Sequence, residues 1–115
     1  GLLKGRRPTR HWSCLEELRL SGAESVEDRW VIDGPIVTGG GVTAGIDFGL
    51  ALVREIWGEP TARATALGIE YRPAPPFSGG HPDAESESIK TVVGALLAER
   101  AEQRLRASER AAARL

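Results

Sequence analysis

Apolar side chains recur at helical spacing in three stretches of the chain, residues 11–22, 43–57 and 86–115. Within each stretch they fall three or four residues apart, as they do on one face of an α-helix. The pattern therefore predicts three amphipathic helices, and we expect a fourth at residues 60–68, packed behind the second. The members of the three faces are His11, Cys14, Leu15 and Leu18; Ile46, Leu50 and Val53; and Ile89, Val92, Val93, Leu96 and Leu97.

Two short β-prone runs, residues 29–33 and 36–38, lie between the first and second helices, and Gly34-Pro35 separates them as a turn. Strands that alternate with helices predict an α/β fold with helices layered over a largely parallel sheet. About three short strands are fewer than such a sheet normally needs, so the chain has the content of part of a domain.

The residue composition changes twice in the last third of the chain. Residues 71–83 hold four of the seven prolines, so we expect an irregular, partly polyproline-like crossing segment without helix or strand. The helix predicted at residues 86–115 carries apolar residues in its first half and is rich in Ala, Arg and Glu in its second half. We expect its first half to dock and its tail to project as a solvated helix with i,i+4 charge pairs.

Three consecutive glycines, Gly39, Gly40 and Gly41, join the second β-prone run to the second helix. A loop without Cβ atoms at a helix N-terminus lets a ligand or another chain approach unpaired N–H groups closely. Thr43 is the expected N-cap, and Asp47 in the first turn suits the helix dipole. Two interpretations stay open, a tight packing turn and a loop that lines a pocket or subunit contact. This loop lacks the lysine and the glycine spacing that are typical of nucleotide-binding loops.

The composition and charge of the chain argue against some classes of binding partner. A formal net charge of −1 and a pI near 6.2 give no electrostatic reason to expect nucleic acid. No apolar run reaches the length of a membrane span or a signal peptide, so we expect a cytoplasmic protein. The chain starts at glycine and has no methionine, so we expect it to be cut from a longer protein.

The one cysteine and two histidines offer few catalytic or metal sites. Cys14 and His11 share a helix face and could nominally act as nucleophile and base, but Cys14 also shares it with leucines and is expected in the core. His81, in the proline-rich segment, is expected at the solvated surface. No Cys or His spacing fits a metal site, and no cofactor is expected.

Three segments, "GLLKGRRPTRHW", "IVTGGGVTAGIDFGLAL" and "IEYRPAPPFSGGHPDAE", resemble successive landmarks of the ThiJ/PfpI family in the class I glutamine amidotransferase-like superfamily. The triple glycine with "EYRPAPPF" is most similar to the isonitrile hydratase branch. The resemblance divides the chain into residues 1–85, the C-terminal part of a ThiJ/PfpI-like domain, and residues 86–115, a C-terminal amphipathic helix with a charged tail.

The resemblance implies an incomplete flavodoxin-like three-layer sandwich, a homodimer, and a parent enzyme that adds water to an isonitrile to give an N-substituted formamide. The nucleophile would be a cysteine upstream of this chain, so the chain alone is expected to be inactive. His11 matches a histidine that faces the nucleophile in several relatives, although Pro8 and Arg10 depart from the family's pattern here. Gly39, Gly40, Gly41 and Thr43 would line the substrate pocket or the dimer contact.

Two other readings of the same resemblance remain open. One is a ligand-sensing domain of an AraC-type transcription regulator, which would carry helix-turn-helix units after this module. The other is a non-enzymatic, stress-related relative. The upstream and downstream sequences would discriminate among the three.

Overall fold

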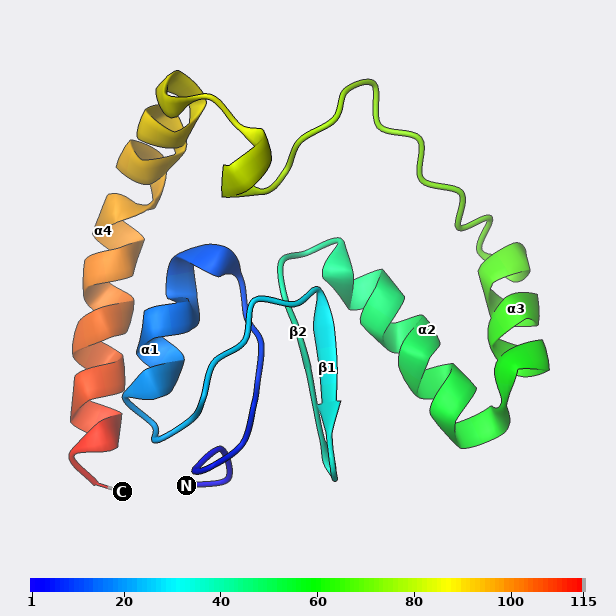
Figure 1. Cartoon of the computed structure of the whole chain (residues 1–115), viewed down its shortest axis with the longest axis horizontal. Helices are drawn as coiled ribbons and strands as arrows, with labels where there is room; N and C mark the ends of the chain where they lie inside the picture. The colour runs from blue at the N-terminus through cyan, green and yellow to red at the C-terminus, as the bar shows by residue number, and fades with distance from the viewer. Residues whose placement is uncertain (115) are drawn as a thin grey trace.

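The computed structural model describes residues 1–114 and places a β-hairpin between two groups of helices (Figure 1). The elements in chain order are η1 (Trp12–Cys14), α1 (Leu15–Arg19), β1 (Trp30–Asp33), β2 (Ile36–Gly39), α2 (Ala44–Trp57), α3 (Glu59–Gly68), η2 (Pro82–Ala84) and α4 (Glu87–Ala112), where η is a 3-10 turn. α1 and α4 lie on one side of the hairpin, and α2 and α3 lie on the other. This helix–sheet–helix order agrees with the layered α/β arrangement that the sequence predicts.

The hairpin forms where two β-prone runs were expected, but its strands are antiparallel. Trp30 pairs with Gly39 and Asp33 with Ile36, and Gly34 turns the chain at a φ of +59°. A two-residue connection can join only antiparallel neighbours, since parallel strands need a long crossover. The expectation of a largely parallel sheet is therefore wrong for the strands in residues 1–114.

An irregular parallel pairing runs beside the hairpin, and it begins where Gly5 donates its N–H to the Gly22 carbonyl at 2.8 Å. The carbonyl of Arg6 accepts a hydrogen bond from the Glu24 N–H at 2.8 Å, and the carbonyl of Pro8 accepts one from Val26 at 3.0 Å. A continuous parallel ladder would also need a donor at residue 8. Because proline has no N–H, these extended segments stay outside the regular sheet. Pro8 itself is fully buried.

Helix α2 covers the hairpin and carries the glycine loop at its start. Ala44 and Ala51 are buried, and Phe48 lies against Gly39. Gly58, at a φ of +86°, ends the helix, and α3 then packs back against it. The helices expected at residues 43–57 and 60–68 are both confirmed.

Replacement of Gly49 by alanine is expected to raise the free energy of unfolding by about 0.5–1 kcal/mol. Gly49 lies inside α2, where an added Cβ would meet no atom within 4 Å. The matched control is Gly34→Ala, which should lower stability, because its φ is positive and its Cβ would lie 3.1 Å from Arg6 Nη1. Urea denaturation followed by far-UV circular dichroism measures both. Equal effects of the two changes would contradict this account.

Helix α4 begins as expected, because the Ser86 hydroxyl accepts a hydrogen bond from the Ile89 N–H at 3.4 Å. Its docking differs from the expectation. Val92 and Leu96 on the apolar half are exposed, whereas Arg104 on the charged half pairs with Glu17 of α1 at 3.1 Å. The tail therefore does not project freely; a buried carboxylate on α1 attracts it. The predicted i,i+4 pairing is present between Glu102 and Arg106.

The chain is more open than a self-contained domain of its size. Its radius of gyration is 16.4 Å, whereas about 13 Å is typical of this length. Its accessible surface is 8,413 Å², whereas about 6,100 Å² is typical of a monomer of this mass. The apolar side chains that contribute to this excess include Ile56, Trp57, Leu67, Ile69, Val92 and Leu96.

Candidate functional site

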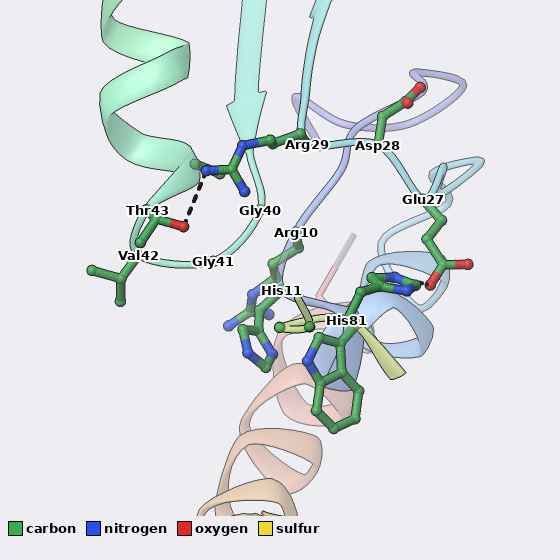
Figure 2. Close-up of a pocket in the computed structure, with 14 residues that line it drawn as sticks. Arg10, His11, Glu27, Asp28, Arg29, Gly40, Gly41, Val42, Thr43 and His81 are labelled. Carbon is green, nitrogen blue, oxygen red and sulfur yellow. Dashed lines mark hydrogen bonds and ion pairs between the residues drawn. The ribbon is translucent and has the colours of Figure 1, made fainter. Parts of the chain in front are cut away.

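A cleft of about 450 Å³ opens where the glycine loop meets three other segments (Figure 2). Its walls are residues 10–12 before α1, residues 27–29 before β1, residues 40–44 at the start of α2, and residues 79–81. Three of the expected pocket residues, Gly40, Gly41 and Thr43, are among them, as is His11. The cleft is thus assembled from segments that lie up to about seventy positions apart in the sequence.

The glycine loop is thin because its neighbours are close. Gly40 donates its N–H to the Arg29 carbonyl at 2.8 Å, and a Cβ at Gly40 would lie 3.3 Å from that same oxygen. A Cβ at Gly41 would lie 3.3 Å from Cδ2 of His11. None of the three glycines has a positive φ. Close approach, not backbone strain, is therefore the reason for glycine at Gly40 and Gly41.

Gly39 and Thr43 behave differently from the expectation for them. Gly39 does not line the cleft; it faces Phe48 of α2. Thr43 occupies the N-cap position, but its side chain caps no backbone N–H. Its hydroxyl instead accepts a hydrogen bond from Arg29 Nη2 at 3.1 Å, the dashed line in Figure 2. The hydroxyl serves to hold Arg29 at the cleft wall.

Asp47 connects that wall to the segment after α3. Its carboxylate accepts hydrogen bonds from Arg29 Nε and from the Tyr71 hydroxyl. Burial raises the pKa of Asp47, but the bonds from Tyr71 and Arg29 outweigh it, so the net shift is downward. The hydrogen bond that Tyr71 donates to Asp47 is the largest cause of a raised pKa of Tyr71, and burial and the negative charge of the carboxylate raise it further.

We expect this network to stabilise the fold between about pH 4 and pH 10 and to weaken outside that window. Because folding lowers the pKa of Asp47, its carboxylate stabilises the folded state above pH 3.8, the ordinary pKa, and this stabilisation is lost as acid protonates the carboxylate. Because folding raises the pKa of Tyr71, its hydroxyl stabilises the folded state below pH 10.0, and this stabilisation is lost as alkali deprotonates it. The midpoint of urea denaturation, determined at a series of pH values, measures the loss of stability in acid and in alkali. Tyr71→Phe should remove the alkaline loss; an unchanged alkaline limb would contradict this role.

His11 is held in one orientation beside the loop. Its Nδ1 accepts a hydrogen bond from the Ser13 N–H at 3.3 Å and lies 2.9 Å from the Ser13 hydroxyl. Its ring also contacts that of Trp12, with ring centroids 5.1 Å apart. Since Nδ1 is the acceptor, the neutral ring carries its proton on Nε2. His11 can therefore present an N–H donor from a fixed ring.

Cys14 is a core residue, as expected. It is buried and free, and its Sγ lies 3.5 Å from the Ser13 hydroxyl. It is not among the residues that line the cleft. A buried thiol in an apolar setting is a poor nucleophile, so the structure separates Cys14 from the candidate chemistry.

His81 lies at the solvated surface, as expected, with 43% of its side chain exposed, and it also makes contacts that the sequence did not predict. The proline-rich segment folds back across the molecule, and His81 Nε2 lies 3.1 Å from a Glu27 carboxylate oxygen while Nδ1 lies 3.5 Å from Asp83. His81 thereby forms part of the cleft wall. Sequence composition identified the loop, but a contact between residues 54 positions apart has no local signal.

Arg10 and Arg29 line the cleft but were not among the predicted site residues. For Arg29 the sequence contains an indication of its place in the cleft. The antiparallel register that pairs Trp30 with Gly39 places Arg29 opposite Gly40, and a hairpin with a Gly34-Pro35 turn fixes that register. For Arg10 the sequence holds no comparable indication.

Two negative findings apply to residues 1–114. No group of three or more His, Cys, Asp or Glu side chains is arranged to bind a metal ion. None of the helices in this range has the length and apolar character needed to cross a membrane.

Comparison with known proteins places these features in a wider context. Residues 1–55 match the DJ-1/PfpI family. Over 115 residues the chain is 45% identical to isonitrile hydratase of Pseudomonas putida, of which it covers 50%. It is 38% identical over 64 residues, 54% of the chain, to the HTH-type transcriptional regulator CdhR of Pseudomonas aeruginosa, of which it covers 19%. The chain thus spans half, or less, of the length of these relatives.

A solved structure supports the fold. A ThiJ/PfpI family protein from Pseudomonas syringae superposes with a TM-score of 0.87 at 39% identity, over 93% of this chain and 44% of that one. The expectation of an incomplete flavodoxin-like α/β fold is therefore confirmed.

Proposed function

We propose that this chain is a portion of an isonitrile-hydrating protein of the DJ-1/PfpI family, whose family model matches residues 1–55. The observation that carries the proposal is 45% identity with an isonitrile hydratase over all 115 residues. The reaction adds one water to an isonitrile and gives an N-substituted formamide.

In this proposal the nucleophile is a cysteine thiolate outside the chain, since Cys14 is buried away from the cleft. The thiolate attacks the electron-poor terminal carbon of the isonitrile while a proton adds to that carbon, which gives a thioimidate. Water then adds to the same carbon, the C–S bond breaks, and the thiolate is regenerated as the N-substituted formamide is released. Gly40 and Gly41 allow Arg29 and His11 to lie close to the loop, which places both side chains at the cleft that the nucleophile would enter. His11, whose ring is fixed by Ser13 and Trp12, supplies the Nε2–H donor at the cleft.

The test uses the longer protein that contains this chain. Incubated with a simple alkyl isonitrile, it should release the matching formamide, measured by chromatography or NMR. His11→Ala should lower turnover by about tenfold or more if the imidazole donates a proton. His81→Ala is the matched control, since His81 also lines the cleft but its ring is already engaged by Glu27, and it should have the smaller effect. Absence of formamide from the intact protein would reject the proposal.

Homodimerisation belongs to the same proposal. The exposed apolar side chains of α2 and α4 provide area for a subunit contact. Sedimentation of the longer protein should give the mass of two copies. A monomer at micromolar concentration would reject this part and leave the chemistry standing.

A ligand-sensing module of a transcription regulator is the second candidate. The 38% identity with CdhR favours it, although over only 64 residues. The cleft would then bind an effector without turnover. Specific DNA retention by the longer protein, together with no formamide release, would favour this candidate over the enzyme.

A further inference from the structure

A second cleft of about 180 Å³ lies next to the candidate site. It is bounded by Trp12, by residues 80–82 and by the first turns of α4, where Ile89 and Val93 line it. Trp12, Gly80 and His81 line the larger cleft as well. The two clefts are therefore neighbours that share one wall.

The smaller cleft offers an apolar surface with few free polar groups. The indole of Trp12, the ring of Pro82 and the side chains of Ile89 and Val93 are apolar. Glu85 and Lys90 also line it, but their charged ends already have partners. A Glu85 carboxylate oxygen accepts the Gly80 N–H at 2.8 Å, and Lys90 Nζ pairs with Glu87 at 2.5 Å. Their apolar stems remain to contact a ligand.

We infer that the smaller cleft is a subsite for the hydrocarbon substituent of a ligand whose polar end occupies the larger cleft. The larger cleft has the polar groups for that end, including Arg10, His11 and Arg29. An apolar group in the smaller cleft would be removed from water without leaving any of these hydrogen-bonding groups unpaired. That the polar end is an isocyano group or its formamide product rests on the proposed function.

The test compares two stable formamides that differ only in the substituent, N-methylformamide and N-butylformamide, added to the longer protein that contains this chain. The butyl compound should bind about fifty-fold tighter, because three more methylene groups leave water. Binding is followed by the NMR signal of each tryptophan indole N–H. Trp12 should shift on binding, whereas Trp57, which lies outside both clefts, should not.

Val93→Phe should fill the subsite and remove most of the preference for butyl over methyl. Val92→Phe is the matched control, since Val92 is the adjacent residue of α4, is exposed, and does not line the cleft. Should Val93→Phe fail to fold by circular dichroism, Val93→Leu adds a single methylene group and should give a smaller loss of the same preference.

Equal binding of the two formamides, no binding of either, or equal effects of the Val92 and Val93 changes would overturn the inference. These outcomes are separable from the fate of the proposed function. Hydration of methyl and butyl isonitriles at equal rates by the longer protein would reject the subsite and keep the enzyme. A Val93-dependent butyl preference without hydration would reject the enzyme and keep the subsite.

Discussion

Replacement of Glu17 by glutamine is expected to lower the free energy of unfolding by about 3 kcal/mol. The Glu17 side chain is 8% exposed, and its carboxylate accepts hydrogen bonds from Arg10 Nη1 at 3.0 Å and from Arg104 Nε at 3.1 Å. Without the negative charge, two guanidinium groups would face each other with no counter-ion between them. The arginines are 42% and 26% exposed, so we place the cost at the lower end for a broken buried pair.

The control for this change lies one position away. Glu16 pairs with Arg19 at 2.6 Å, but the Glu16 side chain is 79% exposed. Glu16→Gln should therefore change stability by less than about 0.5 kcal/mol. Urea titration followed by tryptophan fluorescence measures both variants. Adding Arg104→Gln to Glu17→Gln should restore part of the loss, because it removes one of the two opposed cations. Equal stability of the Glu16 and Glu17 variants would contradict the assigned role of Glu17.

Replacement of Gly40 by valine is expected to cost about 2–3 kcal/mol and to impair the candidate site. The Cβ alone would lie 3.3 Å from the Arg29 carbonyl oxygen, 3.7 Å from Ala44 Cβ and 3.8 Å from the Arg10 carbonyl oxygen. The two methyl groups of valine have no space among these atoms. The hairpin end must then separate from the start of α2, which opens the cleft wall.

The matched control for Gly40→Val is the same substitution at Gly45, where an added Cβ would meet nothing within 4 Å. Gly45→Val should stay within about 0.5 kcal/mol of the parent chain. In the longer protein, Gly40→Val should reduce formamide release or dimerisation. Unchanged turnover together with unchanged sedimentation would show that the loop has neither role.

The local features of this fold were readable from the sequence because they rest on local physics. The hairpin follows from two β-prone runs around Gly34-Pro35, and α2 follows from apolar spacing that stops at Gly58. The burial of Cys14 follows from its leucine-rich face. In each case the deciding residues lie within a few positions of one another.

The contacts that assemble the site could not be read in this way. His81 reaches Glu27 across 54 positions, and Arg104 reaches Glu17 across 87. The apolar stripe of α4 suggested that its first half docks, but a stripe gives no information on which surface is available to cover it. A buried carboxylate with two arginine partners instead fixed the other half. Long-range charge pairing has no periodic signature, so only the structure shows it.

The open shape described above has a consequence for any measurement on this chain. About 2,300 Å² of surface beyond that of a typical monomer of its mass remains in contact with water. A binding partner that covers it favours the folded state in proportion to the logarithm of that partner's concentration. Melting temperatures of the chain should therefore rise with protein concentration or with added partner. A melting temperature measured on the dilute, isolated chain is therefore the lowest value, and the chain with its surface covered is more stable.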